Sequence, residues 1–138
     1  MKINIAGTKV LRLLITDFEP IEKNGDSEDQ APAAGKATFS VKVDFDTERF
    51  FVTFDLTLIT EENKTINVIY ASEFRTDHRI DDDFKKGNFP YINAPAIAYP
   101  FLRAFISNLT LNCGYAAIML PSVNFVELKD RIEKPEGL

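Results

Sequence analysis

The side chains that could do chemistry are few in this chain. His78 is the one histidine among 138 residues, so a Ser-His-Asp or Cys-His site would have to be built around it. It lies in a charged stretch, which favours a solvated loop residue. Cys113, the one cysteine, follows a predicted helix and so lies away from the electropositive helix start that activates thiols. We expect a buried or half-buried structural thiol there and predict that the protein is not an enzyme.

Three consecutive acids, Asp81, Asp82 and Asp83, are the candidate for a divalent cation. Calcium and magnesium prefer oxygen ligands, but the run lacks the alternating spacing and the glycine of an EF-hand loop. A solvated acidic loop is the favoured interpretation. The sequence also lacks a glycine-rich phosphate loop and Cys/His metal spacing. We therefore predict no metal site and no cofactor.

Composition and charge narrow the classes of partner. A net charge of −5 argues against nucleic acid or anionic membrane as the main partner. No apolar stretch approaches the ~20 residues that span a bilayer, so we expect no membrane insertion. A single cysteine cannot form an internal disulfide, and nothing in the cysteine usage indicates an oxidising compartment. These features favour a cytoplasmic protein.

The first half of the chain has the pattern of a sheet. Phe39, Val41 and Val43 alternate with polar residues, a period of two that is typical of half-buried strands. We predict strands over residues 3–18, 38–45, 50–59 and 66–74. Residues 17–36 are polar with two prolines and two glycines, which indicates a loop. The other connections are short, and short connections favour an antiparallel meander.

The second half has the pattern of helices. After a charged connection over residues 76–92, Leu102, Phe105, Ile106 and Leu109 recur at helical spacing. We expect Pro95 and Pro100 to bend this helix or delay its start, and the helix to end at residues 112–114. Asn124 and Glu127 form a capping box for a last helix, which residues 135–137 close. The predicted fold is one α+β domain over residues 1–138, with two helices on one face of the sheet.

Large apolar side chains remain that such a fold does not place. Two helices cover one face of a four-stranded sheet, yet the strand over residues 50–59 carries large apolar side chains on both faces, Phe51 and Ile59 on one and Phe50, Phe54 and Leu56 on the other. Residues 115–120 are apolar with neither the helical nor the strand period. These side chains either complete a core, aided by oligomerisation, or form an exposed groove for apolar ligand segments. Composition alone leaves both interpretations open.

Residues 93–107 carry a distinctive motif. It consists of Pro95, an aromatic and a second proline (Tyr99 and Pro100), then Phe101 and Arg103. Gly114 follows, and then residues 120–125 read Leu-Pro-Ser-Val-Asn-Phe. The motif and its continuation resemble the SecB export chaperones, whose pattern here is Pro-Val-Asn-Phe, so that Ser122 is one inserted residue. The resemblance is strong in the last third of the chain and rests on the strand pattern before it.

The resemblance implies an ATP-independent holdase that binds unfolded polypeptides along hydrophobic grooves. SecB proteins are homotetramers, dimers of dimers, in which the long helices lie between two eight-stranded sheets, and they deliver preproteins to the SecA ATPase. The resemblance places polypeptide binding at Tyr115, Ile118, Met119, Leu120, Phe125 and Leu128. It places the oligomer interface at Ile97, Tyr99, Phe101, Leu102, Phe105, Ile106 and Leu109.

The chain also departs from the family. Members that deliver to SecA carry acidic residues on the exposed sheet face, and the best register puts Leu14 and Tyr70 at those places. This argues against SecA as a partner and makes a diverged member dedicated to one client, such as an antitoxin, at least as plausible as a general export chaperone. A binder of small hydrophobic ligands on the curved sheet is the other alternative.

Overall fold

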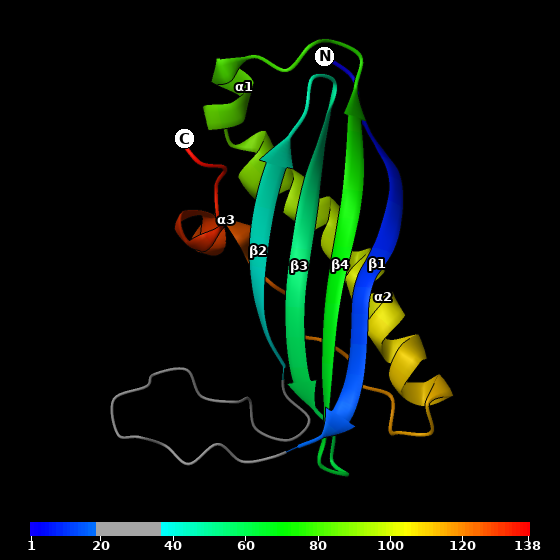
Figure 1. Ribbon diagram of the computed structural model, residues 1–138. Helices are drawn as coiled ribbons and strands as arrows, with labels where there is room; N and C mark the ends of the chain where they lie inside the picture. The colour runs from blue at the N-terminus through cyan, green and yellow to red at the C-terminus, as the bar shows by residue number, and fades with distance from the viewer. Residues whose placement is uncertain (19–36) are drawn as a thin grey trace, which may run out of the picture.

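The computed structural model describes residues 1–18 and 37–138, so the predicted loop over residues 17–36 lies, except for its first two residues, outside the described residues. Four strands are followed by helices (Figure 1). The strands are β1 (Ile3–Asp17), β2 (Ala37–Phe45), β3 (Arg49–Ile59) and β4 (Lys64–Thr76). The helices are α1 (Asp82–Lys86), the π-helical turn η1 (Phe89–Asn93), α2 (Ala94–Asn112), α3 (Phe125–Leu128) and the 3₁₀ turn η2 (Lys129–Arg131).

The predicted fold class is confirmed: a four-stranded antiparallel sheet precedes the helices. The strand order is β1-β4-β3-β2, so β2, β3 and β4 form a meander while β1 pairs with β4 instead of β2. The edge of β2 is held at one point by the C-terminal segment. Glu133 donates its N–H to the Val41 carbonyl at 2.9 Å and accepts from the Val43 N–H at 3.0 Å. Among the described residues, no strand lies along the free edge of β1.

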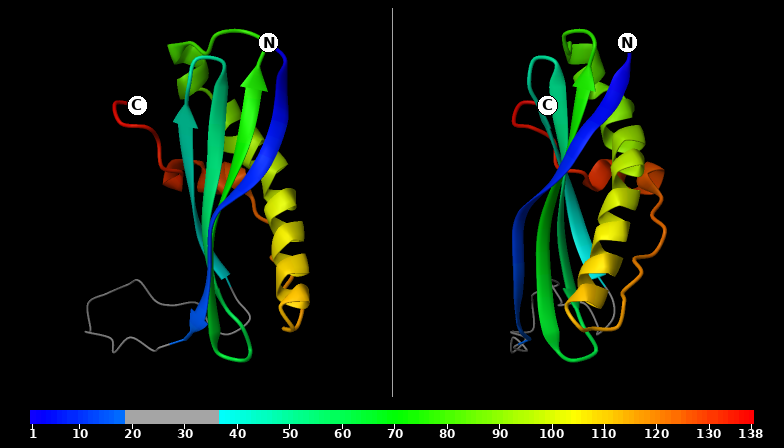
Figure 2. Two further views of the ribbon diagram at one scale, coloured as in Figure 1. Left: turned by 45° about the vertical axis from the view of Figure 1, so that its right-hand side comes forward. Right: turned by 90° about the vertical axis from the view of Figure 1, so that its right-hand side faces the viewer.

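Alternation along the strands gives the sheet an inner and an outer face. On β3, Phe50, Val52, Phe54, Leu56 and Leu58 are fully buried, as the two-residue period predicts. Figure 2 shows α2 and α3 on the side of the sheet to which these residues point. The core therefore lies between the inner face and the helices, and no described helix covers the outer face.

Aromatic rings supply much of this core. One cluster gathers around Phe50, which stacks on Phe74 with ring centroids 5.0 Å apart. A second cluster gathers around Phe54, with Tyr99 of α2 at 6.1 Å and Phe125 of α3 at 6.4 Å. Such pairs add stability beyond the area they bury, so the two clusters fix where α2 and α3 lie on the sheet.

The connection between β4 and α2 is more ordered than the sequence predicted. The Asp81 carboxylate caps α1 by accepting the Phe84 N–H at 2.8 Å, and Asp82 and Asp83 occupy the first turn, where negative charge is favourable. The acidic run is exposed, as expected, but it begins a helix instead of forming a loop.

Helix α2 follows η1 without a break, so the prolines do not delay it, and Pro100 lies inside it. Gly114 ends the helix at φ 90°, a left-handed conformation that glycine adopts without strain. The last helix is shorter than predicted. Asn124 caps it by accepting the Val126 N–H at 3.0 Å, but α3 ends at Leu128 and a 3₁₀ turn replaces the expected continuation.

Candidate functional site

The segment after α2, residues 115–121, has neither helix nor strand, and we call it the linking segment. It is attached to α2 at three points. The Thr110 carbonyl accepts the Tyr115 N–H at 2.9 Å, and the Thr110 hydroxyl accepts the Ile118 N–H at 2.9 Å. The Tyr99 hydroxyl donates to the Pro121 carbonyl at 2.6 Å. These bonds hold an irregular backbone in a defined position, so its side chains are presented without a large further ordering cost.

Thr110 is a residue that the sequence reasoning missed. Its side chain is fully buried, and its hydroxyl donates to the Ile106 carbonyl at 2.9 Å while it holds the Ile118 amide. A signal was present, because Leu102, Ile106 and Thr110 repeat every four residues along one face of α2. A hydroxyl within such an apolar stripe needs buried hydrogen-bond partners. It finds a carbonyl within the helix, at Ile106, and an N–H in the linking segment, at Ile118.

The six predicted polypeptide-binding residues separate into two groups. Met119 is 71% exposed, and Tyr115, Ile118 and Leu128 are partly buried. Leu120 and Phe125 are 2% and 4% exposed, and both belong to the core cluster. The prediction for these two is corrected: they pack inward and hold the linking segment and α3 against the sheet.

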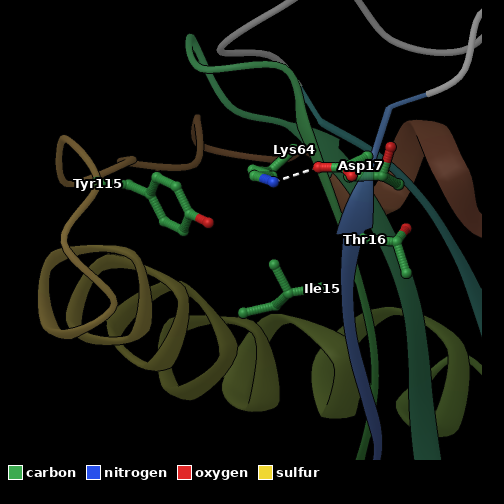
Figure 3. A pocket seen from close by; sticks show the side chains of 6 residues that line it. Ile15, Thr16, Asp17, Lys64 and Tyr115 are labelled. Carbon is green, nitrogen blue, oxygen red and sulfur yellow. Dashed lines mark hydrogen bonds and ion pairs between the residues drawn. The ribbon is translucent and has the colours of Figure 1, made fainter.

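Open pockets surround the exposed group. Figure 3 shows Tyr115 facing Lys64 and Asp17 across the mouth of a pocket of about 740 Å³, with Ile15 below. A second pocket, of about 220 Å³, lies between residues 115–119 and the β3–β4 turn. A third, of about 370 Å³, lies between Met119 and the exposed side of α2. Tyr115 lines the first two pockets and Met119 the last two, so the linking segment joins the pockets into one surface.

The rim of this surface is charged. Lys64 and Asp17 form an ion pair at the mouth of the first pocket. The hydrogen bond from Lys64, together with its charge, lowers the pKa of the Asp17 carboxyl, and Asp17 raises the pKa of Lys64 in return. Both groups therefore stay ionised at neutral pH. Apolar side chains such as Ile15 and Met119 beside this charged rim suit a polypeptide whose apolar side chains bind while its polar backbone remains near water.

The seven predicted interface residues on α2 also separate. Ile97 and Phe101 are exposed, and Phe105 and Leu109 are partly buried. Tyr99, Leu102 and Ile106 are buried in the core of the chain itself. Leu111, which the sequence reasoning left out, is also exposed on α2.

Other predicted positions are also placed by the structure. His78 is exposed, and its Nδ1 lies 2.6 Å from the Asp77 carboxylate. Cys113 is exposed, which corrects the expectation of a buried or half-buried thiol. Leu14 lies on the outer sheet face. Tyr70 does not: it is buried on the inner face and stacks on Phe105 at 5.5 Å, because it shares the period of Ile66 and Val68. The register that placed Tyr70 on the exposed face is wrong.

Comparison with known proteins gives one family. The family model described as "Preprotein translocase subunit SecB" matches residues 28–133. Among solved structures, the chain is similar to the Mycobacterium tuberculosis Rv1957 SecB-like chaperone in complex with a ChAD peptide from the Rv1956 HigA1 antitoxin. The TM-score is 0.61 at 16% identity, over 88% of this chain and 90% of that one.

It is also similar to a protein of unknown function from Streptococcus agalactiae, with a TM-score of 0.50 at 13% identity, over 88% of this chain and 98% of that one. No curated protein sequence matches the chain. Among the described residues, no helix is long and apolar enough to cross a membrane.

Proposed function

Because this chain belongs to the SecB family, we propose that it is an ATP-independent chaperone that holds non-native polypeptides in the cytoplasm. The observation that carries the proposal is the linking segment. Its exposed Met119 lies between backbone positions that Thr110 and Tyr99 fix by hydrogen bonds, and open pockets lie on either side. The proposal requires neither a nucleotide nor a cofactor.

Binding rests on burial of apolar surface. Each Å² of apolar area removed from water contributes about 25 cal/mol before ordering costs. The pockets mix apolar side chains, such as Ile15, Ile118 and Met119, with polar ones, and the pocket between Met119 and α2 is the most apolar of the three. An unfolded segment with spaced apolar residues would therefore bind with little sequence specificity. Pockets open to solvent suit such a segment better than a small hydrophobic ligand, which favours an enclosed cavity.

The proposal includes a homo-oligomer, a tetramer built as a dimer of dimers, with the chain acting as a single domain. Two surfaces support it. The free edge of β1 is long, and an uncovered edge strand is a template for pairing with a second copy. The exposed side of α2 presents Ile97 and Phe101, apolar side chains that a second layer of helices would cover. Sedimentation velocity measures this directly, and a stable monomer at micromolar concentration would contradict it.

A second candidate is a chaperone dedicated to one client. The solved M. tuberculosis chaperone is in complex with a peptide from an antitoxin, and its structure matches 88% of this chain. Leu14 lies on the outer face where members that deliver to SecA carry an acidic residue, which gives no support to SecA as a partner. Tyr70 does not bear on this point, because it lies on the inner face. Purification from the native cells separates the two candidates, because a dedicated chaperone carries one polypeptide and a general one carries many.

Met119→Asp tests the binding surface. The probe is reduced, carboxymethylated α-lactalbumin, which stays unfolded without denaturant. We expect its affinity to fall about tenfold, since a charge replaces an apolar contact that contributes roughly 1–2 kcal/mol. Light scattering should show an unchanged oligomer, because Met119 is exposed.

Val126→Asp is the matched control, since Val126 is also exposed but lines none of the three pockets. Unchanged affinity in Met119→Asp, or an equal loss in Val126→Asp, would contradict the assignment.

A further inference from the structure

The outward edge of β2 is covered at one point by residues 129–135, which we call the strap (Figure 1). Glu133 forms a parallel bridge with Lys42: its N–H donates to the Val41 carbonyl at 2.9 Å, and its carbonyl accepts the Val43 N–H at 3.0 Å. Because backbone groups alternate in direction along a strand, these two bonds show that the odd-numbered residues of β2 direct their N–H and C=O groups outward. The strap thus satisfies two backbone groups on the edge of a nine-residue strand.

Side chains on either side of Glu133 hold the strap in place. Ile132 is buried and belongs to the core cluster. The Lys134 ammonium lies 5.0 Å from the centre of the Tyr91 ring, which is a cation–π contact. Glu133 itself is exposed, and it contacts β2 through its backbone. The strap is therefore a short anchored segment, and a full strand beside β2 would satisfy more of the same edge than the strap does.

The sequence of β2 is complementary to itself. In an antiparallel pair of two β2 strands, a twofold axis at Val43 places Lys42 of each chain opposite Asp44 of the other. Within one chain these two side chains are about half exposed and form a long ion pair at 3.7 Å. Opposite charges directly across an antiparallel pair are favourable, and like charges are unfavourable. This charge pattern selects a second copy of the chain as the strand that fits the edge.

We propose that the strap guards β2 against pairing with β2 of a second copy, and that release of the strap opens this edge to self-association. An uncovered edge strand is a template for such pairing. Backbone groups of Val41, Val43 and Phe45 bond across the new interface, in place of the two bonds to Glu133. Because β1 is the other edge of the sheet, copies joined at both edges would form an open-ended chain, which the strap prevents. The inference does not rest on the proposed chaperone function.

Glu133→Pro tests the proposal, because it removes the N–H that bonds to the Val41 carbonyl. Ile132 already has the extended backbone, with ψ 128°, that a following proline requires. Sedimentation velocity at micromolar concentrations should show the mass of the variant rise about twofold above that of the unchanged protein, as pairing across a twofold axis joins two units. Hydrogen exchange should show the Val41 N–H gaining protection in the associated form. Glu133→Gln is the matched control: it removes the same charge but keeps the N–H, so its mass should not change.

Charge reversal on β2 separates this pairing from non-specific aggregation. In the Glu133→Pro background, Lys42→Asp and Asp44→Lys each place like charges across the interface, so each variant alone should keep the mass of the unchanged protein. An equimolar mixture of the two places opposite charges across the interface and should associate again.

Ile132→Ala loosens the strap at its buried anchor and serves as a second release variant, with circular dichroism confirming that each variant is folded. Unchanged mass in both Glu133→Pro and Ile132→Ala would overturn the proposal. Association of the charge variants alone, or no association of their mixture, would overturn it as well. A gain in affinity for carboxymethylated α-lactalbumin without a rise in mass would also contradict it, because the edge would then bind client strands and not a second copy.

Discussion

The two faces of the sheet are made by the same strands but serve different purposes. On β3, Phe54 is fully buried among aromatic rings, while its neighbour Asp55 is exposed on the outer face. The inner face is almost wholly apolar and covered by helices, so its residues are determined by packing. The outer face is free of that requirement. Its mixture of Phe51, Lys9 and Arg12 is therefore not determined by packing against the helices.

The linking segment repeats this contrast on a smaller scale. Leu120 and Phe125 pack inward, while Met119 and Val126, one residue from each of them, are exposed. Neighbours in the sequence thus divide between core and surface without a regular period. Substitutions at adjacent positions test this contrast directly, because one of the two side chains is buried in the core and its neighbour is exposed to solvent.

The largest effect is expected at Phe54. Phe54→Ala removes a ring that packs on Phe39, Tyr99 and Phe125, and it leaves a cavity between the sheet and the helices. We expect the free energy of unfolding to fall by about 3–5 kcal/mol, as measured by urea denaturation. Asp55→Ala on the outer face should change it by no more than about 0.5 kcal/mol. Similar losses for the two variants would mean that both faces are packed.

The sheet could be predicted from the sequence because strand alternation is a local signal. Val41 and Val43 on β2, and Val52 and Phe54 on β3, each follow a period of two, and this period predicts which side chains lie on the inner face. The pairing of β1 with β4 could not be predicted this way, since it joins residues from 47 (Asp17 with Lys64) to 73 (Ile3 with Thr76) positions apart and depends on packing between them.

The functional site was predicted less well for a similar reason. Helical spacing put Leu102 and Ile106 on one face of α2, but spacing alone could not decide whether that face meets the sheet or a second chain. In the linking segment no period exists, so Leu120 and Met119 were indistinguishable until the hydrogen bonds from Thr110 and Tyr99 placed the backbone.

The next effect in size is expected at Phe125. Phe125→Ala removes a ring whose centroid lies 5.7 Å from that of Tyr99, and the free energy of unfolding should fall by about 3 kcal/mol. Val126→Ala, at a position 65% exposed, should change it by less than about 0.5 kcal/mol. Thermal unfolding followed by circular dichroism measures both. If Phe125→Ala instead keeps full stability and loses affinity for carboxymethylated α-lactalbumin, Phe125 is a client contact and its placement in the core is wrong.

The smallest effect is expected at Thr110, and it separates the anchoring of the linking segment from simple packing. Thr110→Val keeps the shape of the side chain but removes the acceptor of the Ile118 N–H. The Ile118 N–H is partly buried, so leaving it without its acceptor should lower the free energy of unfolding by about 1 kcal/mol, the low end of the cost for a buried donor. Thr53→Val makes the same chemical change on the outer face and should be neutral within about 0.5 kcal/mol. Hydrogen exchange supplies the decisive measurement. In Thr110→Val the Ile118 amide should lose protection while β3 amides keep theirs, and affinity for unfolded polypeptide should fall because Met119 is no longer held in place. Equal loss of protection in β3 would show that the hydroxyl stabilises the whole core and does not position the linking segment.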